Sequence, residues 1–195
     1  LMAAVPTRKL PGRSSDCEDW PRRPLLRDLV GRRPSTDEYR TPRWVWEPWH
    51  EALNFTLDAA ATSENKLPPC QWWLTKNDDA LTRHWEAPVG AVWCNPPYSR
   101  KAGPLHRWVS KALEESRRGL VICMLLPADT STDWFTLLWD RVNGCWNPGV
   151  RGYFTDCRVR FIDPATGKKT LGTPTFGSLI VVMSPSPVMD PRRGY

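Results

Sequence analysis

The strongest constraint on the fold is a pair of apolar runs, at residues 90–94 and 120–126, with an amphipathic segment between them. A strand with one face in water would alternate apolar and polar residues, but these runs are apolar throughout. A strand, a helix and a second strand of this kind pair in parallel, because the helix crosses over the sheet. The sequence therefore predicts an α/β protein with a mostly parallel sheet covered on both faces.

The segment between the two runs predicts a helix that opens at Pro104 and closes at Gly119. Its expected inward face consists of Leu105, Trp108, Val109, Ala112 and Leu113, and its outward face of Arg107, Lys111, Glu114 and Arg118.

An earlier helix is expected at about residues 43–53, with Thr41 as its N-cap and Pro42 in its first position. Its inward stripe consists of Val45, Trp46, Trp49 and Leu53. We expect short strands at 55–58 and 71–74, a short helix near 133–141 and a loop over 142–155. Strands at 158–163 and 176–183 would form a late antiparallel hairpin that closes the sheet.

The first 35 residues are predicted to be a poorly ordered, basic, proline-rich arm ahead of one catalytic domain at 36–195. Residues 1–34 carry eight basic and four acidic side chains, a large part of the chain's net charge of +6. Such an arm could hold a polyanion through phosphate contacts, although a solvated leader without a partner is an equal alternative.

Other sequence features favour a reducing, intracellular location and no metal. The six cysteines have no paired spacing, and the three histidines have no ligand spacing among themselves. The longest apolar run is far too short to span a bilayer, and no signal peptide is evident.

The apolar run at 90–94 ends in Asn95-Pro96-Pro97-Tyr98, which is the most distinctive local motif. Two consecutive prolines stiffen the backbone and remove two N–H donors, so carbonyl oxygens remain as acceptors. Asn95 adds an amide oxygen, and Tyr98 adds a flat face with a polar tip. The motif suits a planar ring with an exocyclic amino group, although Pro-Pro after a strand is also ordinary turn chemistry.

Carboxylates follow two of the predicted strands. Asp58 ends the strand at 55–58 and precedes the small residues Ala59 and Ala60, which permit a ligand to approach closely. Asp78 and Asp79 lie in the polar exit of the strand at 71–74. Carboxylates there can bind nucleoside hydroxyl or amino groups, or can simply stabilise a helix N-terminus.

Several segments, in matching order, resemble the small phage-encoded DNA N6-adenine methyltransferases of the Dam type. They are residues 37–42, 55–60, 93–99, 126–130, 160–163 and 176–178. The resemblance implies a Rossmann-like methyltransferase fold, S-adenosyl-L-methionine as methyl donor, adenine in double-stranded DNA as acceptor, and an enzyme of phage or prophage origin in the bacterial host cytoplasm.

The resemblance also implies roles for individual residues. In the catalytic motif Asn95-Pro96-Pro97-Tyr98, Asn95 and the Pro96 carbonyl would accept the N–H groups of the adenine amine, and Tyr98 would stack on the extruded base. The residues implied in cofactor binding are Thr41, Pro42, Asp58, Ala59, Ala60, Asn65, Asp78 and Asp79. The first-strand turn departs from many methyltransferases, because it has alanines where they have glycines.

Two other functions share parts of this pattern. A glutamine-amide protein methyltransferase also carries Asn-Pro-Pro-Tyr, but it usually has a glycine-rich first turn and would not need a basic arm. A catalytically weak DNA-binding module that kept the pocket is the third possibility. The sequence reveals neither the DNA recognition sequence nor the oligomeric state, and contacts to DNA are expected from residues 99–103, 143–155 or the arm.

Overall fold

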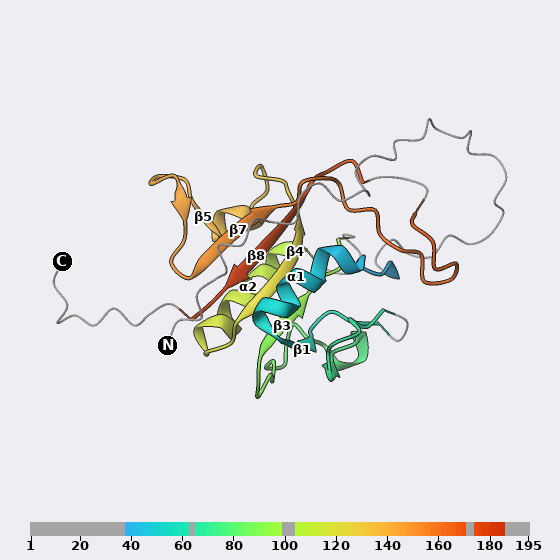
Figure 1. Ribbon diagram of the computed structural model, residues 1–195. Helices are drawn as coiled ribbons and strands as arrows, with labels where there is room; N and C mark the ends of the chain where they lie inside the picture. The colour runs from blue at the N-terminus through green and yellow to red at the C-terminus, as the bar shows by residue number, and fades with distance from the viewer. Residues whose placement is uncertain (1–37, 63–64, 99–103, 171–173, 186–195) are drawn as a thin grey trace.

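A six-stranded mixed sheet forms the centre of the molecule (Figure 1). The structure is a computed structural model that describes residues 38–62, 65–98, 104–170 and 174–185. The strand order is β2-β1-β3-β4-β8-β7. Strands β1 (Phe55–Asp58), β2 (Trp72–Trp73), β3 (Ala91–Cys94) and β4 (Ile122–Pro127) are parallel, and β8 (Ser178–Met183) is antiparallel to both of its neighbours, β4 and β7 (Val150–Phe154). The predicted α/β class, with a mostly parallel sheet that ends in an antiparallel pair, is confirmed.

The two faces of the sheet are covered by different helices. Along β4, Met124 packs into a core that also contains Val109 of α2 (Leu105–Arg117). The next residue along the strand, Leu125, packs into a second core with Val45 of α1 (Arg43–Leu53). This alternation explains the apolar runs, because successive side chains of a strand enter opposite cores and neither face meets water.

Helix α1 has the predicted length, but the predicted cap is wrong. Pro42, in an extended conformation, is the N-cap residue, and no side chain caps the helix. The Thr41 hydroxyl is engaged elsewhere, with Asn95. Asn54 ends the helix in the left-handed region with φ of 55°.

Helix α2 confirms the predicted inward positions Trp108, Val109 and Ala112, but one expected outward residue is buried. The Nζ atom of Lys111 lies 2.6 Å from the carboxylate of Glu115, and neither side chain is more than 6% exposed. A charged residue is expected to face water, so the sequence pattern predicted Lys111 on the outer face of the helix. Its ion pair with Glu115, one turn later, permits the side chain to be buried.

The region after β4 departs most from expectation. The helix predicted near 133–141 is one 3-10 turn, η5 (Trp134–Leu137), followed by a small hairpin of β5 (Trp139–Asp140) and β6 (Cys145–Trp146). The predicted loop at 142–155 contains β6 and all of β7. Strand β8 pairs with β7 instead, and residues 158–163 contribute only the isolated bridges of Ile162 with Arg40 and with Lys169. Strand β7 was not predicted because its sequence, Val-Arg-Gly-Tyr-Phe, has an internal glycine and no regular alternation of apolar and polar residues.

Strand β2 is shorter than the predicted 71–74, and both of its tryptophans are partly exposed at the edge of the sheet. A 3-10 turn, η3 (Lys76–Asp78), follows it. In the part of the chain that the structure describes, no helix has the length and apolarity needed to cross a membrane. The predicted arm at 1–35 and the loop at 99–103 lie outside the described residues.

Candidate active site at the carboxyl edge of the sheet

The sheet brings the ends of several strands to one edge. Strands β1, β3 and β4 are parallel, so their carboxyl ends lie together. The backbone N–H of Ala59 donates to the Trp93 carbonyl at 2.9 Å, which ties the end of β1 to β3. Strand β8 runs in the opposite direction, and its first residue, Ser178, pairs with Pro127. Phe176, just before β8, is thus brought to the edge where Asn95 follows β3.

Asn95 and Tyr98 contact each other directly within the Asn-Pro-Pro-Tyr turn. The Tyr98 hydroxyl lies 3.0 Å from Asn95 Oδ1 and 2.9 Å from the Leu125 carbonyl oxygen. Loss of water around this hydroxyl raises its pKa well above the ordinary value, so the group stays protonated and can donate. The Tyr98 ring meets the ring of Phe176 edge to face, with 5.9 Å between centroids. The turn is held in place by β4 and by the segment before β8.

Thr41 holds the other end of the Asn95 amide. Asn95 Nδ2 donates to Thr41 Oγ1 at 3.2 Å, and the Thr41 side chain is buried. Since the amide nitrogen faces Thr41, the amide oxygen faces Tyr98. The sequence predicted Thr41 as a helix N-cap and as a cofactor residue, and its separation of 54 positions from Asn95 leaves no local signal for this contact. Phe176 was part of the family resemblance, but no role was derived for it.

Asp58 is buried in the turn after β1, where it organises the chain that follows. Its carboxylate accepts hydrogen bonds from the backbone N–H of Ala60 at 3.2 Å and of Leu67 at 2.9 Å. Burial raises the pKa of Asp58 to about 6, although these two hydrogen bonds oppose the shift. Ala59 is fully buried, and Ala60 partly so. The turn is therefore built by the carboxylate and by two small side chains.

The other implied cofactor residues have structural partners as well. Asn65 donates from Nδ2 to the Tyr39 carbonyl at 2.9 Å, which links its loop to the segment before Pro42. Asp78 accepts from the backbone N–H and the hydroxyl of Thr75, and the first of these bonds contributes most to a lowered pKa. This is a capping arrangement, as in the structural alternative considered for Asp78. Asp79 has φ of 47° and ends the 3-10 turn.

A second group of ionisable side chains lies away from this edge. His84 Nδ1 and Lys111 Nζ lie 3.0 and 2.6 Å from the same oxygen of Glu115, and Glu114 is next to them. Burial raises the pKa of Glu115, but the hydrogen bonds from Lys111 and His84 outweigh it and lower the pKa overall. Because the Lys111 ammonium already supplies a cation, this group is an ion-pair network rather than a vacant ligand set.

The mixed sheet, mostly parallel and with an antiparallel end, defines an α/β protein whose fold is compatible with the methyltransferase class. A model of the family "DNA N-6-adenine-methyltransferase (Dam)" matches residues 31–193. A DNA N-6-adenine-methyltransferase of Escherichia phage T1 is 32% identical to this chain, and the match covers 82% of the chain and 71% of that protein. The chain therefore belongs to the DNA N-6-adenine-methyltransferase (Dam) family, as the order of the motifs predicted.

Proposed function

We propose that this protein transfers a methyl group from S-adenosyl-L-methionine to N6 of an adenine in double-stranded DNA, at the corner formed by Asn95, Pro96, Pro97 and Tyr98. One observation carries the assignment of the site. The Asn95 amide is held from both ends, by Thr41 and by Tyr98, at the edge where ligands bind in open α/β sheets. An amide fixed in this way has a defined acceptor direction.

The residue types match the chemistry of the amine. The N6 lone pair of adenine is delocalised into the ring, so the amine is a weak nucleophile until its hydrogens are drawn out of the ring plane. Asn95 Oδ1 has a second lone pair besides the one facing Tyr98, and the Pro96 carbonyl supplies another acceptor. Tyr98 offers its ring face to the base. An amide does not act as a base at neutral pH, so catalysis rests on placement and electrostatics, and the proton leaves to water.

The cofactor would lie beside this corner. Its sulfonium supplies the electrophilic methyl group. Small side chains at Ala59 and Ala60 permit close approach, and Thr41 and Pro42 border the Asn95 corner. The proposed residues fit a zwitterionic nucleoside in kind, since hydroxyl, amide and carboxylate oxygens can bind its amino group and its ribose hydroxyls. The remaining members of the proposed set are Asn65, Asp58, Asp78 and Asp79, of which Asp58 acts by shaping the loop.

A base within a duplex cannot reach a corner of this kind, so the adenine is extruded before transfer. We assign residues 36–195 to the catalytic domain and residues 1–35 to a basic arm that contacts DNA phosphates. Since the substrate is DNA, the enzyme acts in the bacterial host cytoplasm.

Transfer of a labelled methyl group from the cofactor to DNA or to protein tests this function. Label in DNA as N6-methyladenine is the expected result. Label in protein would instead indicate the glutamine-amide reaction, and the absence of label would indicate a binding module. Asn95→Ala should lose most of its turnover, because its role is confined to the target amine, and should still bind the cofactor in calorimetry. Gln71→Ala, which truncates an exposed amide before β2, is the matched control.

A further inference from the structure

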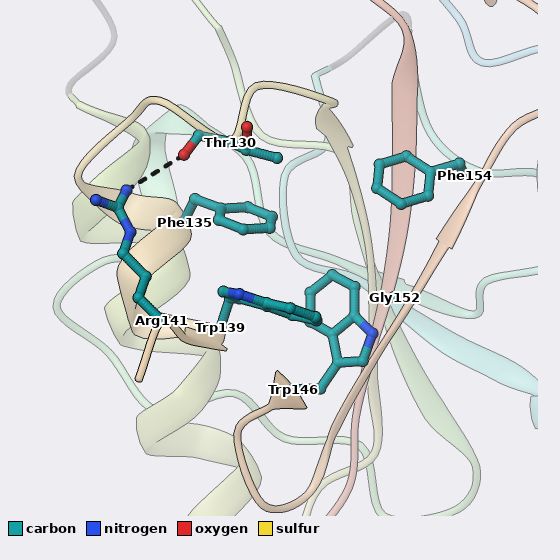
Figure 2. Close-up of a pocket in the computed structure, with 7 residues that line it drawn as sticks. All are labelled: Thr130, Phe135, Trp139, Arg141, Trp146, Gly152 and Phe154. Carbon is teal, nitrogen blue, oxygen red and sulfur yellow. Dashed lines mark hydrogen bonds between the residues drawn. The ribbon is translucent and has the colours of Figure 1, made fainter. Parts of the chain in front are cut away.

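A cavity of about 500 Å³ lies beside β7, and its lining residues do not belong to the Asn95 corner. Figure 2 shows this lining. Six of the residues around it are Phe135, Trp139, Arg141, Trp146, Gly152 and Phe154. They come from η5, from the β5–β6 hairpin and from β7. The volume is within the range of small-molecule sites, and the lining is mostly aromatic. We refer to this cavity as the aromatic pocket.

The walls of the aromatic pocket are packed against one another. The rings of Trp139 and Trp146 are perpendicular with 5.1 Å between centroids, and Phe135 contacts both. A Cβ atom at Gly152 would lie 2.1 Å from Trp146 Cζ2, so the indole rests directly on the backbone of β7. Glycine at this position thus makes room for the indole, and the Trp146 wall has a fixed position.

Phe154, by contrast, is a large apolar side chain that faces water. It is 55% exposed at the end of β7, and in Figure 2 its ring lies across the pocket from Phe135 and Trp146. A ring exposed next to a rigid aromatic wall can gain contact area when a flat molecule enters between them. Stacking of this kind accepts any nucleobase, because every base has a π face.

Arg141 provides the charge at this site. Its Nη2 atom donates to the Thr130 carbonyl at 3.2 Å, and the side chain is exposed. A guanidinium has five N–H donors, so this bond leaves others for a phosphate. The adjacent carboxylate, Asp140, accepts from the backbone N–H groups of Val142 and Asn143 and is thereby held in the hairpin turn.

The aromatic pocket lies on the same edge of the sheet as the methylation corner. Phe154 pairs with Leu179, next to the pair Ser178–Pro127 that ends β4. Three strand spacings separate β7 from β3, which corresponds to about 14 Å. Bases along one strand of DNA are about 3.4 Å apart, so DNA held at Asn95 can reach the pocket. Strand β1, with the turn proposed for the cofactor, is one spacing farther away.

We propose that the aromatic pocket holds a second nucleobase of the DNA substrate, one other than the target adenine, between Phe154 and Trp146, while Arg141 contacts the adjoining phosphate. This inference rests on DNA being the substrate. It makes the segment from η5 to β7 a part of the DNA-binding surface that grips an unpaired nucleotide near the site of methylation.

The test uses two fluorescein-labelled single strands of about 12 nucleotides, within the usual range of site sizes, one of oligodeoxythymidine and one fully abasic. Neither contains adenine, so neither can occupy the target corner in the proposed way. The full-length protein should bind the thymidine strand more tightly than the abasic strand in fluorescence anisotropy, by roughly 5- to 150-fold. Phe154→Ala should lose most of this preference, and Asn95→Ala should keep it.

Two further variants sharpen the result. Trp72→Ala removes a ring that is 43% exposed at the opposite edge of the sheet, so it matches Phe154→Ala in kind and should leave the preference intact. Arg141→Gln should lower the affinity for both strands, and the slope of log affinity against log salt concentration should fall in magnitude by about one. Thermal midpoints check that each variant is folded.

Equal affinity of the wild-type protein for the two strands would overturn the proposal, as would a preference that survives in Phe154→Ala. Methyl transfer to adenine-containing duplex DNA is measured on the same samples. If the wild-type protein methylates the duplex but does not distinguish the two strands, the pocket proposal fails and the methyltransferase function stands. If the wild-type protein distinguishes the two strands but does not methylate the duplex, the methyltransferase function fails and the pocket still binds a nucleobase.

Discussion

Replacing Tyr98 with phenylalanine separates two roles of this side chain. The change removes only the hydroxyl, which lies between the Asn95 amide oxygen at 3.0 Å and the Leu125 carbonyl at 2.9 Å. The ring keeps its edge-to-face contact with Phe176. One hydroxyl has one hydrogen to donate, so a single net hydrogen bond is lost, with a stability cost of about 0.5–1.5 kcal/mol.

The kinetic effect of Tyr98→Phe follows from the position of the lost bond. Without the hydroxyl, the Asn95 oxygen is no longer directed from one side, and we expect kcat to fall by roughly two- to tenfold, the kinetic equivalent of about 0.5–1.5 kcal/mol. The KM for DNA should change little, because the ring face that stacks on the base remains. Steady-state transfer of labelled methyl to DNA measures both quantities.

Tyr98→Ala is the companion variant that removes the ring as well. We expect a further weakening of base capture of about 1–3 kcal/mol, seen mainly in the KM for DNA. Thermal unfolding identifies any part of the effect that comes from a loosened fold. If Tyr98→Phe raised the KM as much as Tyr98→Ala does, the hydroxyl rather than the ring would hold the base, and the stacking role would be wrong.

Two other predictions concern the groups around this corner. Thr41→Val removes the hydroxyl that accepts from Asn95 Nδ2 and should lower kcat by roughly two- to tenfold, equivalent to the loss of one net hydrogen bond. Thr56→Val, whose hydroxyl bonds the Val89 carbonyl outside the site, is the control, and an equal loss in both would refute a positioning role. Asp58 has a pKa raised from 3.8 to about 6 by burial, so it contributes stability that is fully present below its unfolded pKa and is lost as pH rises through about 6. In urea unfolding, the advantage of wild type over Asp58→Asn should shrink by about 3 kcal/mol between about pH 4 and about pH 7, and a pH-independent difference would contradict the assignment.

The centre of the fold was predictable because its signals are local and redundant. The apolar runs at 90–94 and 120–126 gave β3 and β4, and Pro104 and Gly119 bounded the helix between them. Strand β7 offered no such signal. Its position depends on pairing with β8, which is remote in the sequence, and on the Trp146 indole that lies against Gly152, a contact that the residue pattern does not reveal. Lys111 was misplaced for a related reason, since its burial depends on the partner Glu115 rather than on its own polarity.

The candidate site also has a part that local sequence predicts and a part that depends on tertiary packing. The Asn-Pro-Pro-Tyr turn is contiguous, so its acceptors and its ring could be recognised from residue types alone. The contact from Thr41 to Asn95 could not, because it depends on how α1 is placed over the sheet. Val45 of α1 shares a core with Trp93 of β3, and this packing brings the residue before the helix to the end of the strand. The burial that stabilises the fold therefore also sets the direction of the Asn95 amide, and a change in the packing of α1 is transmitted to the target amine without touching the motif itself.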